Sequence, residues 1–290
     1  MQDLINALIA TPWLAYGVIA ILGLCVGSFL NVVIYRMPLM MQRQWTQDCQ
    51  LYLHPDQPLA EPQPLTLSQP ASRCPSCGHV IRWYENIPLI SWLALQGRCS
   101  ACNTSIGIRY PLVEIGTMLA SIAVFSVFGP TLTMLAALGL TWCLIALTGI
   151  DFDTQLLPDR ITLPLAGAGL FANSMGLFVS PIQSILGYVM GFLILWIVYI
   201  IFKLITGKEG MGYGDFKLLA ALGAWLGPLM LPLIILLSSV VGAIIGIILL
   251  RIRKENQPFA FGPYIAIAGF IALLWGTQLV NGYLTFARLS

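Results

Sequence analysis

Four aspartates beside long apolar segments are the residues of this sequence best suited to chemistry. Asp151, Asp153 and Asp159 lie in "DFDTQLLPDR", and Asp215 lies in "GMGYGDFK" at positions 210 to 217. Two carboxyl groups held a few ångströms apart do not both ionise readily, so one keeps a proton while the other polarises a water molecule. Two of these aspartates could therefore form an acid–base pair. The glycines around Asp215 would let a peptide backbone approach its carboxyl group.

Other hydrolytic mechanisms find little support. The sequence has no HExxH motif, and its two histidines, His54 and His79, lie in a polar loop away from any candidate nucleophile at a membrane edge. The structural alternative for "GYGD" is a turn in which Asp215 caps a short helix that begins at Phe216. The acids remain the main catalytic candidates.

Four of the seven cysteines form two CxxC pairs, "CPSCGH" and "CSACN". The pattern C-x2-C-x21-C-x2-C is typical of a structural zinc site, although its central gap slightly exceeds the usual range of about 15 to 20 residues. Four thiolates would leave zinc no open position for water, so the predicted role is folding. Metal-free or redox-active thiols are the alternative. The predicted ligands are Cys74, Cys77, Cys99 and Cys102.

The remaining candidates near these pairs are assigned ordinary roles. His79 could replace a zinc ligand, but a surface histidine is the favoured interpretation. Cys25, Cys49 and Cys143 are interpreted as packing or spare thiols. Since the paired cysteines follow the basic flank that begins at Arg36, we expect a reducing compartment and no disulfides.

The elements that position these residues are predicted to be membrane helices. The chain has 290 residues, of which 58% are hydrophobic and 9% are charged, and its mean hydropathy is +0.85. Repeated uncharged stretches of about 20 residues indicate a polytopic membrane protein. The net charge of +2 is too small to indicate a nucleic-acid partner. The first apolar segment, 13 to 35, lacks a basic region before it, so we expect a retained span rather than a cleaved signal peptide.

We predict an all-α fold of about eight transmembrane helices, with both termini outside. The segment 216 to 227 has only about 12 apolar residues, a length that also fits a re-entrant segment. If it crosses, 13 of the 14 Lys and Arg residues fall on the cytosolic side and only Arg288 does not. Spans are expected at about 112–129, 131–150, 161–179, 182–203 and 216–227, with two more beyond.

Several of these motifs together resemble the bacterial prepilin peptidases, membrane aspartyl proteases of the GxGD type. The resemblance rests on the two acidic motifs, the two CxxC pairs, "GSFLNVVIYRMP" and "IRYPLVE", and it covers about residues 23 to 254. It implies three parts: a first span at 1–35, a cytosolic domain with the zinc site at 36–110, and a helical bundle at 111–290 that carries the protease core at about 131–254.

The resemblance also implies two activities, neither of which follows from composition or spacing. One is removal of the leader peptide from type IV prepilins and type II secretion pseudopilins at the cytosolic face of the bacterial inner membrane. The other is N-methylation of the new N-terminal residue by S-adenosylmethionine. The implied partners are these membrane substrates, and the oligomeric state stays open.

The family pattern places the catalytic pair at Asp151 and Asp215. Asp153 is the alternative partner, but it lies about 200° from Asp151 on a helix, so the two would not face one site equally. Asp159 is expected to be the N-cap of the following span. For Lys217, an unpaired cytosolic lysine is favoured over an ion pair. We expect the pair to activate water as general base and general acid, without an acyl-enzyme.

The residues that bind the methyl donor are left unassigned. No glycine-rich nucleotide loop is present, so the cytosolic domain and the end of the first span are the surfaces left for it. Gly27, Ser28 and Asn31 could contribute, although helix packing is favoured for them. Glu114 is a candidate for substrate recognition, with a salt bridge to Arg109 or another loop arginine as the alternative.

Two other classes of function are considered. A proton-coupled transporter could use the same carboxylates as a relay, but it would place acids in mid-span. A zinc-stabilised membrane scaffold would tolerate loss of the acids.

Overall fold

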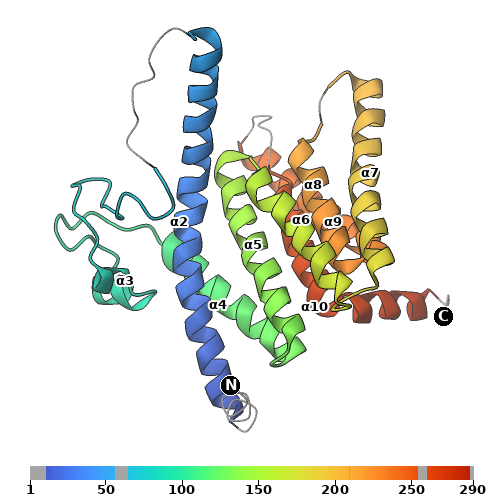
Figure 1. The fold of residues 1–290 in the computed structure, drawn as a ribbon, viewed down its shortest axis with the longest axis horizontal. Helices are drawn as coiled ribbons and strands as arrows, with labels where there is room; N and C mark the ends of the chain where they lie inside the picture. The colour runs from blue at the N-terminus through green and yellow to red at the C-terminus, as the bar shows by residue number, and fades with distance from the viewer. Residues whose placement is uncertain (1–10, 56–64, 209, 254–259, 288–290) are drawn as a thin grey trace. The chain divides into compact units, whose positions relative to one another are not determined.

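The computed structural model describes residues 11–55, 65–208, 210–253 and 260–287. Within these ranges the chain is almost entirely helical, with only two isolated β-bridges, which confirms the predicted all-α membrane class. The chain forms two compact units, Met1–Phe125 and Ser126–Ser290. The longer helices are α2 (Pro12–Leu53), α4 (Arg109–Phe128), α5 (Leu132–Thr154), α6 (Asp159–Ser174), α7 (Pro181–Thr206), α8 (Tyr213–Leu226), α9 (Leu231–Arg253) and α10 (Gly262–Phe286) (Figure 1).

Six of these eight helices are long and apolar enough to span a membrane by themselves: α2, α4, α5, α7, α9 with the turn before it, and α10. The other two, α6 and α8, have 16 and 14 residues. At 1.5 Å per residue they measure about 24 and 21 Å, less than the hydrocarbon core of about 30 Å. The predicted count of about eight transmembrane helices is therefore approximate: six of the helices described here are candidate full spans, and α6 and α8 are too short to be counted with them.

Helix α2 is longer than the predicted span of 13 to 35. It has 42 residues and continues through Pro38 to Leu53, so the segment after Arg36 is helix and not loop. The charge of Arg36 ends the apolar stretch, but the residues that follow, "LMMQRQ", are good helix formers. The change in polarity at Arg36 therefore does not mark a helix boundary.

Small residues allow α2 to pack closely on α4. A Cβ atom added to Gly27 would lie 2.7 Å from the Cα of Glu114, and one added to Gly23 would lie 2.7 Å from the Cα of Met118. Such close backbone approach is typical of glycine in membrane helix interfaces. The packing role favoured for Gly27 is supported.

Helix α8 lies at the centre of the C-terminal unit, against α6, α7 and α10 (Figure 1). All of its residues from Leu218 to Leu226 are buried. The backbones of α7 and α8 nearly touch, since a Cβ atom on Gly187 would lie 2.1 Å from the carbonyl oxygen of Gly223. This packing holds a helix that is too short and too enclosed to be anchored by lipid.

Polar groups fix the C-terminal end of α8. The indole Nε1 of Trp225 donates to the Leu165 carbonyl at 2.8 Å. The buried Asn173 amide donates to the carbonyls of Ala224 and Trp225 at 2.8 and 3.0 Å. Buried polar groups of this kind are stabilising only when paired, and these pairs set the position of α8 relative to α6.

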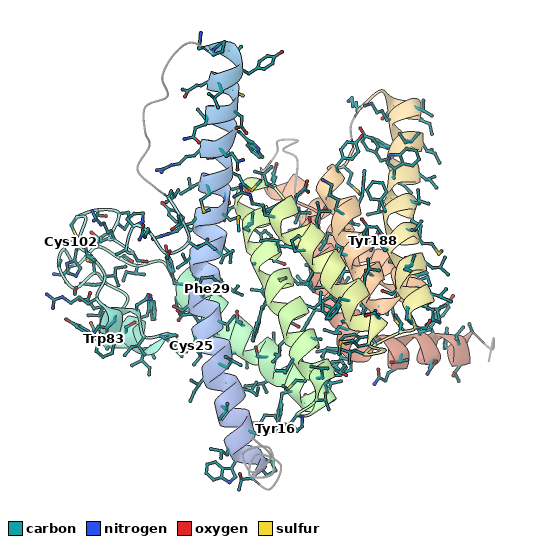
Figure 2. All side chains as sticks on the ribbon, in the orientation of Figure 1. Tyr16, Cys25, Phe29, Trp83, Cys102 and Tyr188 are labelled. Atoms are coloured by element: carbon teal, nitrogen blue, oxygen red, sulfur yellow. The ribbon has the colours of Figure 1, made fainter. Side chains whose placement is uncertain are left out.

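Large apolar side chains remain exposed along several helices. Phe29 stands out from α2, as Figure 2 shows. So many exposed large apolar side chains are rare on soluble monomers but are expected where helices face lipid. The exposed apolar residues of α7 include Ile182, Ile185, Leu186, Val189, Ile197 and Val198.

Candidate functional site

Asp151 lies in the last turn of α5 and is only 4% exposed. The helix ends at Thr154, and its C-cap Gln155 adopts the left-handed conformation (φ 54°, ψ 34°) and donates its backbone N–H to the Asp151 carbonyl. The neighbouring Asp153 is exposed. The structure thus separates the two acids as helical periodicity predicts, with Asp151 buried within the unit and Asp153 directed elsewhere.

Asp215 is the third residue of α8 and is 8% exposed. The helix begins at Tyr213 with Gly212 as its N-cap, so the alternative that Asp215 caps a helix beginning at Phe216 is wrong. The Asp215 carboxylate accepts a hydrogen bond from the backbone N–H of Gly212, as the third residue does in a capping box. This bond orients the carboxylate at the helix start.

The carboxyl groups of Asp151 and Asp215 lie near enough for their charges to interact. Both are buried in the C-terminal unit, although they come from α5 and α8. Two like charges in such surroundings disfavour double ionisation. The arrangement is chemically able to activate water, with one group accepting a proton and the other donating one.

An ion pair joins the starts of α6 and α8 beside these acids. The Lys217 Nζ donates to both carboxylate oxygens of Asp159 at 2.7 Å. Asp159 is the first residue of α6, whose N-cap is Pro158. The expected N-cap role of Asp159 is therefore wrong, and so is the unpaired role favoured for Lys217. Because both side chains are partly exposed, the pair contributes at most about 1 kcal/mol.

The four paired cysteines converge in the N-terminal unit through two similar turns. In the first, Cys74 N–H donates to the His79 carbonyl and Gly78 N–H donates to the Cys74 carbonyl, both at 2.9 Å. In the second, Cys99 N–H donates to the Thr104 carbonyl at 2.9 Å and Asn103 N–H to the Cys99 carbonyl at 3.0 Å. Gly78 and Asn103 both have positive φ, at 73° and 56°, a conformation that these residue types tolerate.

The sulfur spacing fits a tetrahedral metal site. The Sγ atoms of Cys74, Cys77, Cys99 and Cys102 all lie within 4.8 Å of one another, with Cys74 to Cys102 at 3.8 Å and Cys77 to Cys99 at 4.0 Å. Zinc bonded to sulfur at about 2.3 Å separates its ligands by about 3.8 Å. The distances are far too long for disulfides, whose S–S length is about 2.05 Å.

Local hydrogen bonds lower the pKa of two of the four thiols, Cys74 and Cys102, whereas the side chains of the neighbouring cysteines, with burial, raise the pKa of Cys77 to about 12. Backbone N–H groups of Cys77 and Ser76 lower the pKa of Cys74. The Thr104 side chain and backbone lower the pKa of Cys102 to about 6. Deprotonated thiols are the form that binds metal. The long gap between the pairs is filled by η1 (Trp83–Asn86) and α3 (Ile90–Ala94).

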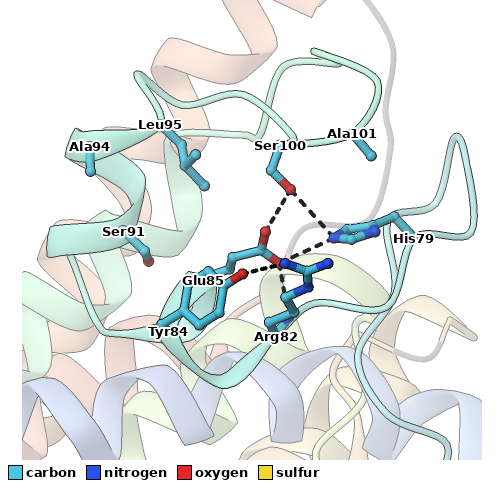
Figure 3. A pocket seen from close by; sticks show the side chains of 9 residues that line it. All are labelled: His79, Arg82, Tyr84, Glu85, Ser91, Ala94, Leu95, Ser100 and Ala101. Atoms are coloured by element: carbon cyan, nitrogen blue, oxygen red, sulfur yellow. Dashed lines mark hydrogen bonds and ion pairs between the residues drawn. The ribbon is translucent and has the colours of Figure 1, made fainter.

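A cavity of about 550 Å³ adjoins the second cysteine turn (Figure 3). Its polar centre is Glu85, which accepts from Ser100 Oγ at 2.7 Å and from the Arg82 backbone at 2.9 Å. His79 Nε2 lies 3.2 Å from the same carboxylate. His79 thus pairs with an acid while the metal cluster consists of cysteines alone. Both oxygens of Glu85 are occupied, which indicates a structural role for this side chain.

The polar residues considered for methyl-donor or substrate binding make contacts within the N-terminal unit. The buried Glu114 accepts the Leu89 backbone N–H at 2.7 Å and is hydrogen-bonded to Ser28. Asn31 donates to the Tyr110 carbonyl at 3.1 Å. Arg36, whose position after the first apolar segment predicts only a basic flank, donates to the carbonyls of Thr66 and Pro70 at 3.0 and 2.7 Å. These contacts tie the loop to α2 and α4.

The sequence patterns did not predict two residues that lie near the acids. Gly262, at the start of α10, donates its backbone N–H to the Asp151 carboxylate. Leu157 lies between Gly262 and Gly214, close to both. The available signal was the Gly262–Pro263 pair, because proline is favoured in the first turn of a helix. That signal predicts a helix start and not the partner that the start contacts.

Together, the helices and the buried acid pair define a polytopic membrane protein with an acid site at the ends of its helices. Comparisons with known proteins identify the family to which the chain belongs. Residues 21–128 match the Bacterial Peptidase A24 N-terminal domain, and residues 138–247 match the Type IV leader peptidase family. The first range lies almost wholly in the N-terminal unit and the second lies wholly in the C-terminal unit.

Several curated relatives align along nearly the whole chain, and each carries the name prepilin leader peptidase/N-methyltransferase. The relative from Stutzerimonas stutzeri is 56% identical over 93% of this chain and 93% of its own length. Those from Aeromonas hydrophila and Pseudomonas aeruginosa are each 54% identical, over 94% and 92% of this chain and 95% and 92% of their own lengths. No solved structure matches the chain. The chain belongs to the type IV leader peptidase family of aspartic peptidases.

Proposed function

We propose that this protein cleaves the leader peptide from prepilins and N-methylates the new N-terminus. The main support for this proposal is the buried pair Asp151 and Asp215, which come from α5 and α8 in a chain of this family. Family membership and a pair at helix ends favour a peptidase over a proton-coupled transporter or an inert scaffold.

In the proposed cleavage, one carboxylate of the pair takes a proton from a water molecule while the oxygen of that water attacks the scissile carbonyl carbon. The protonated partner supplies a proton to the tetrahedral intermediate. When the C–N bond breaks, the amide nitrogen leaves as an amine with that proton, and the carbonyl carbon becomes a carboxylic acid. One proton is shared again at the end, so the pair is ready for a further cycle.

The two cofactors have separate proposed roles. Cys74, Cys77, Cys99 and Cys102 would hold a zinc ion whose binding free energy stabilises the fold of the loop. S-adenosylmethionine would supply the methyl group that the new terminal amine receives. We place its site in the N-terminal unit and assign no residues to it, since the polar side chains considered for it have structural partners.

The proposed location is the bacterial inner membrane, with the acid pair and the cysteine cluster facing the cytosol. This orientation is supported by the distribution of Lys and Arg in the sequence. The proposed substrates are type IV prepilins and the related type II secretion pseudopilins, whose apolar segment would lie in the membrane and whose basic leader would lie in the cytosol.

Both activities can be tested in one reaction. The purified protein is incubated with a prepilin-like peptide and isotopically labelled S-adenosylmethionine, and the products are read by mass spectrometry. We expect the free leader and a shortened peptide that carries one labelled methyl group on its terminal nitrogen. An uncut peptide in the presence of folded protein would contradict the peptidase assignment, and a cut but unlabelled peptide would contradict the methyltransferase assignment.

A further inference from the structure

Gly262 occupies a position against the acid pair that tolerates no side chain. Its backbone N–H donates to the Asp151 carboxylate, and it is the first residue of α10. A Cβ atom built on Gly262 would lie 2.6 Å from Oδ2 of Asp151. That separation is well below van der Waals contact, so any larger residue must displace the carboxylate or the helix start.

Leu157 fills the space on the other side of this contact. The same Cβ atom on Gly262 would lie 3.0 and 3.2 Å from the Leu157 Cδ atoms. Leu157 also lies against Gly214, where an added Cβ atom would be 2.7 Å from the Leu157 Cβ. One side chain therefore separates the start of α10 from the residue that precedes Asp215.

These contacts connect three elements that are distant in sequence. Asp151 belongs to α5, Asp215 to α8 and Gly262 to α10, and α10 packs against both of the others. A backbone N–H donor holds a carboxylate in a fixed position, because the donor has no rotamers and its place is set by the helix that contains it. The glycine lets this donor reach the carboxylate directly.

We propose that Gly262 is a positioning residue for leader-peptide cleavage: its backbone holds the Asp151 carboxylate at the distance from Asp215 that the reaction needs. This inference rests on the proposed peptidase function. It extends the site beyond the predicted protease core of about 131–254. Gly262 acts through Asp151 and not on the substrate, so its loss lowers kcat and leaves KM nearly unchanged.

The primary test compares Gly262→Ala with Gly282→Ala. Gly282 lies in the same helix and has no atom within 4 Å of an added Cβ. We expect Gly262→Ala to lower kcat for leader release about 100-fold, as displacements of about 1 Å in catalytic groups do, and Gly282→Ala to behave as the wild type. Equal activity of the two variants would overturn the proposal.

A double variant separates displacement of Asp151 from crowding of Leu157. Leu157→Val removes the Cδ atoms that the new methyl group would meet, but it leaves the overlap with Asp151 Oδ2. We expect Gly262→Ala/Leu157→Val to stay as slow as Gly262→Ala. Recovery of cleavage in the double variant would place the defect at Leu157 and overturn the assignment.

Methylation of a peptide that already lacks its leader reports on the N-terminal unit independently of the acid pair, and thermal unfolding in detergent, expected to match the wild type, reports on the fold of the C-terminal unit that carries Gly262. We expect Gly262→Ala to methylate this peptide at the wild-type rate, and loss of methylation as well as cleavage would contradict a positioning role. The wild type and Asp215→Asn are run beside it. If the wild type does not cleave, the proposed function fails; if it cleaves and Gly262→Ala cleaves equally well, only the present inference fails.

Discussion

At the scale of single residues, burial distinguishes acids that the sequence presents as near neighbours. Asp151 and Asp153 are two positions apart, yet only Asp151 is buried. This difference follows from helical periodicity and could be predicted. The roles of Asp159 and Asp215 as N-caps were wrong because a cap depends on where a helix begins to within one residue, and Pro158 and Gly212 take that position.

Glu85 gives the N-terminal unit a pH dependence that can be measured. Hydrogen bonds from the Arg82 backbone, the Ser100 hydroxyl and His79 lower the pKa of Glu85 from 4.5 to about 2. Because the pKa in the folded state lies below its ordinary value, the ionised form stabilises the fold above about pH 4.5. That contribution is lost as the pH falls from 4.5 towards 2.

We therefore expect Glu85→Gln to weaken protection of the backbone amides at 82–86 near neutral pH. The difference from the wild type should shrink as the pH falls from about 4.5 towards 2. Hydrogen exchange of these amides, normalised to an unstructured peptide at each pH, measures it. A difference between the two proteins that does not change with pH would show that the charge of Glu85 is not the cause.

At the scale of elements, the sequence predicted the existence of the helices better than their ends. The apolar stretches revealed every long helix, because membrane helices need about 20 apolar residues. The extension of α2 to Leu53 was missed, since hydropathy does not report helix continuation in water. The sequence also did not predict that α8 is surrounded by α6, α7 and α10. This burial depends on tertiary packing, which composition does not specify.

The contact between α7 and α8 should be sensitive to a single methyl group. In Gly223→Ala the new Cβ atom would lie 2.1 Å from the Gly187 carbonyl oxygen, a backbone atom that cannot rotate away. We expect a loss of about 1 to 3 kcal/mol in stability, as is usual for overpacked interiors, together with slower cleavage because α8 carries Asp215. Thermal unfolding in detergent measures the stability.

The matched control is Gly139→Ala in α5, where no atom lies within 4 Å of an added Cβ. This change should be neutral or slightly stabilising, because alanine is the better helix former. Equal unfolding temperatures for Gly223→Ala and Gly139→Ala would show that the α7–α8 contact is looser than described.

At the scale of the whole molecule, the chain divides into two units, and each contains a range that matches its own family model. The cysteine spacing and the acidic motifs were readable from sequence because each is local. The position of Gly262 beside Asp151 was not, because it depends on how α10 returns to α5 in the folded bundle. Proximity of this kind follows from tertiary packing alone.

Removal of the metal should affect the N-terminal unit alone. We expect about one zinc per chain in the purified protein, and we expect chelation to increase hydrogen exchange over residues 72–106 while α8 stays protected. Four protein ligands would make a bound zinc structural, so its binding free energy would support the local fold. Metal analysis and hydrogen exchange measure both points. Absence of bound metal, or exchange that chelation leaves unchanged, would contradict the zinc assignment.

The most direct test of the acid pair is the rate of leader release by three asparagine variants. We expect Asp151→Asn and Asp215→Asn each to lose about 100-fold to 10,000-fold in rate, the usual contribution of general acid–base catalysis, while the exposed Asp153→Asn keeps the wild-type rate. Thermal unfolding in detergent, unchanged in all three, shows that the C-terminal unit of each variant is folded. Near-wild-type cleavage by Asp151→Asn or Asp215→Asn would contradict the account.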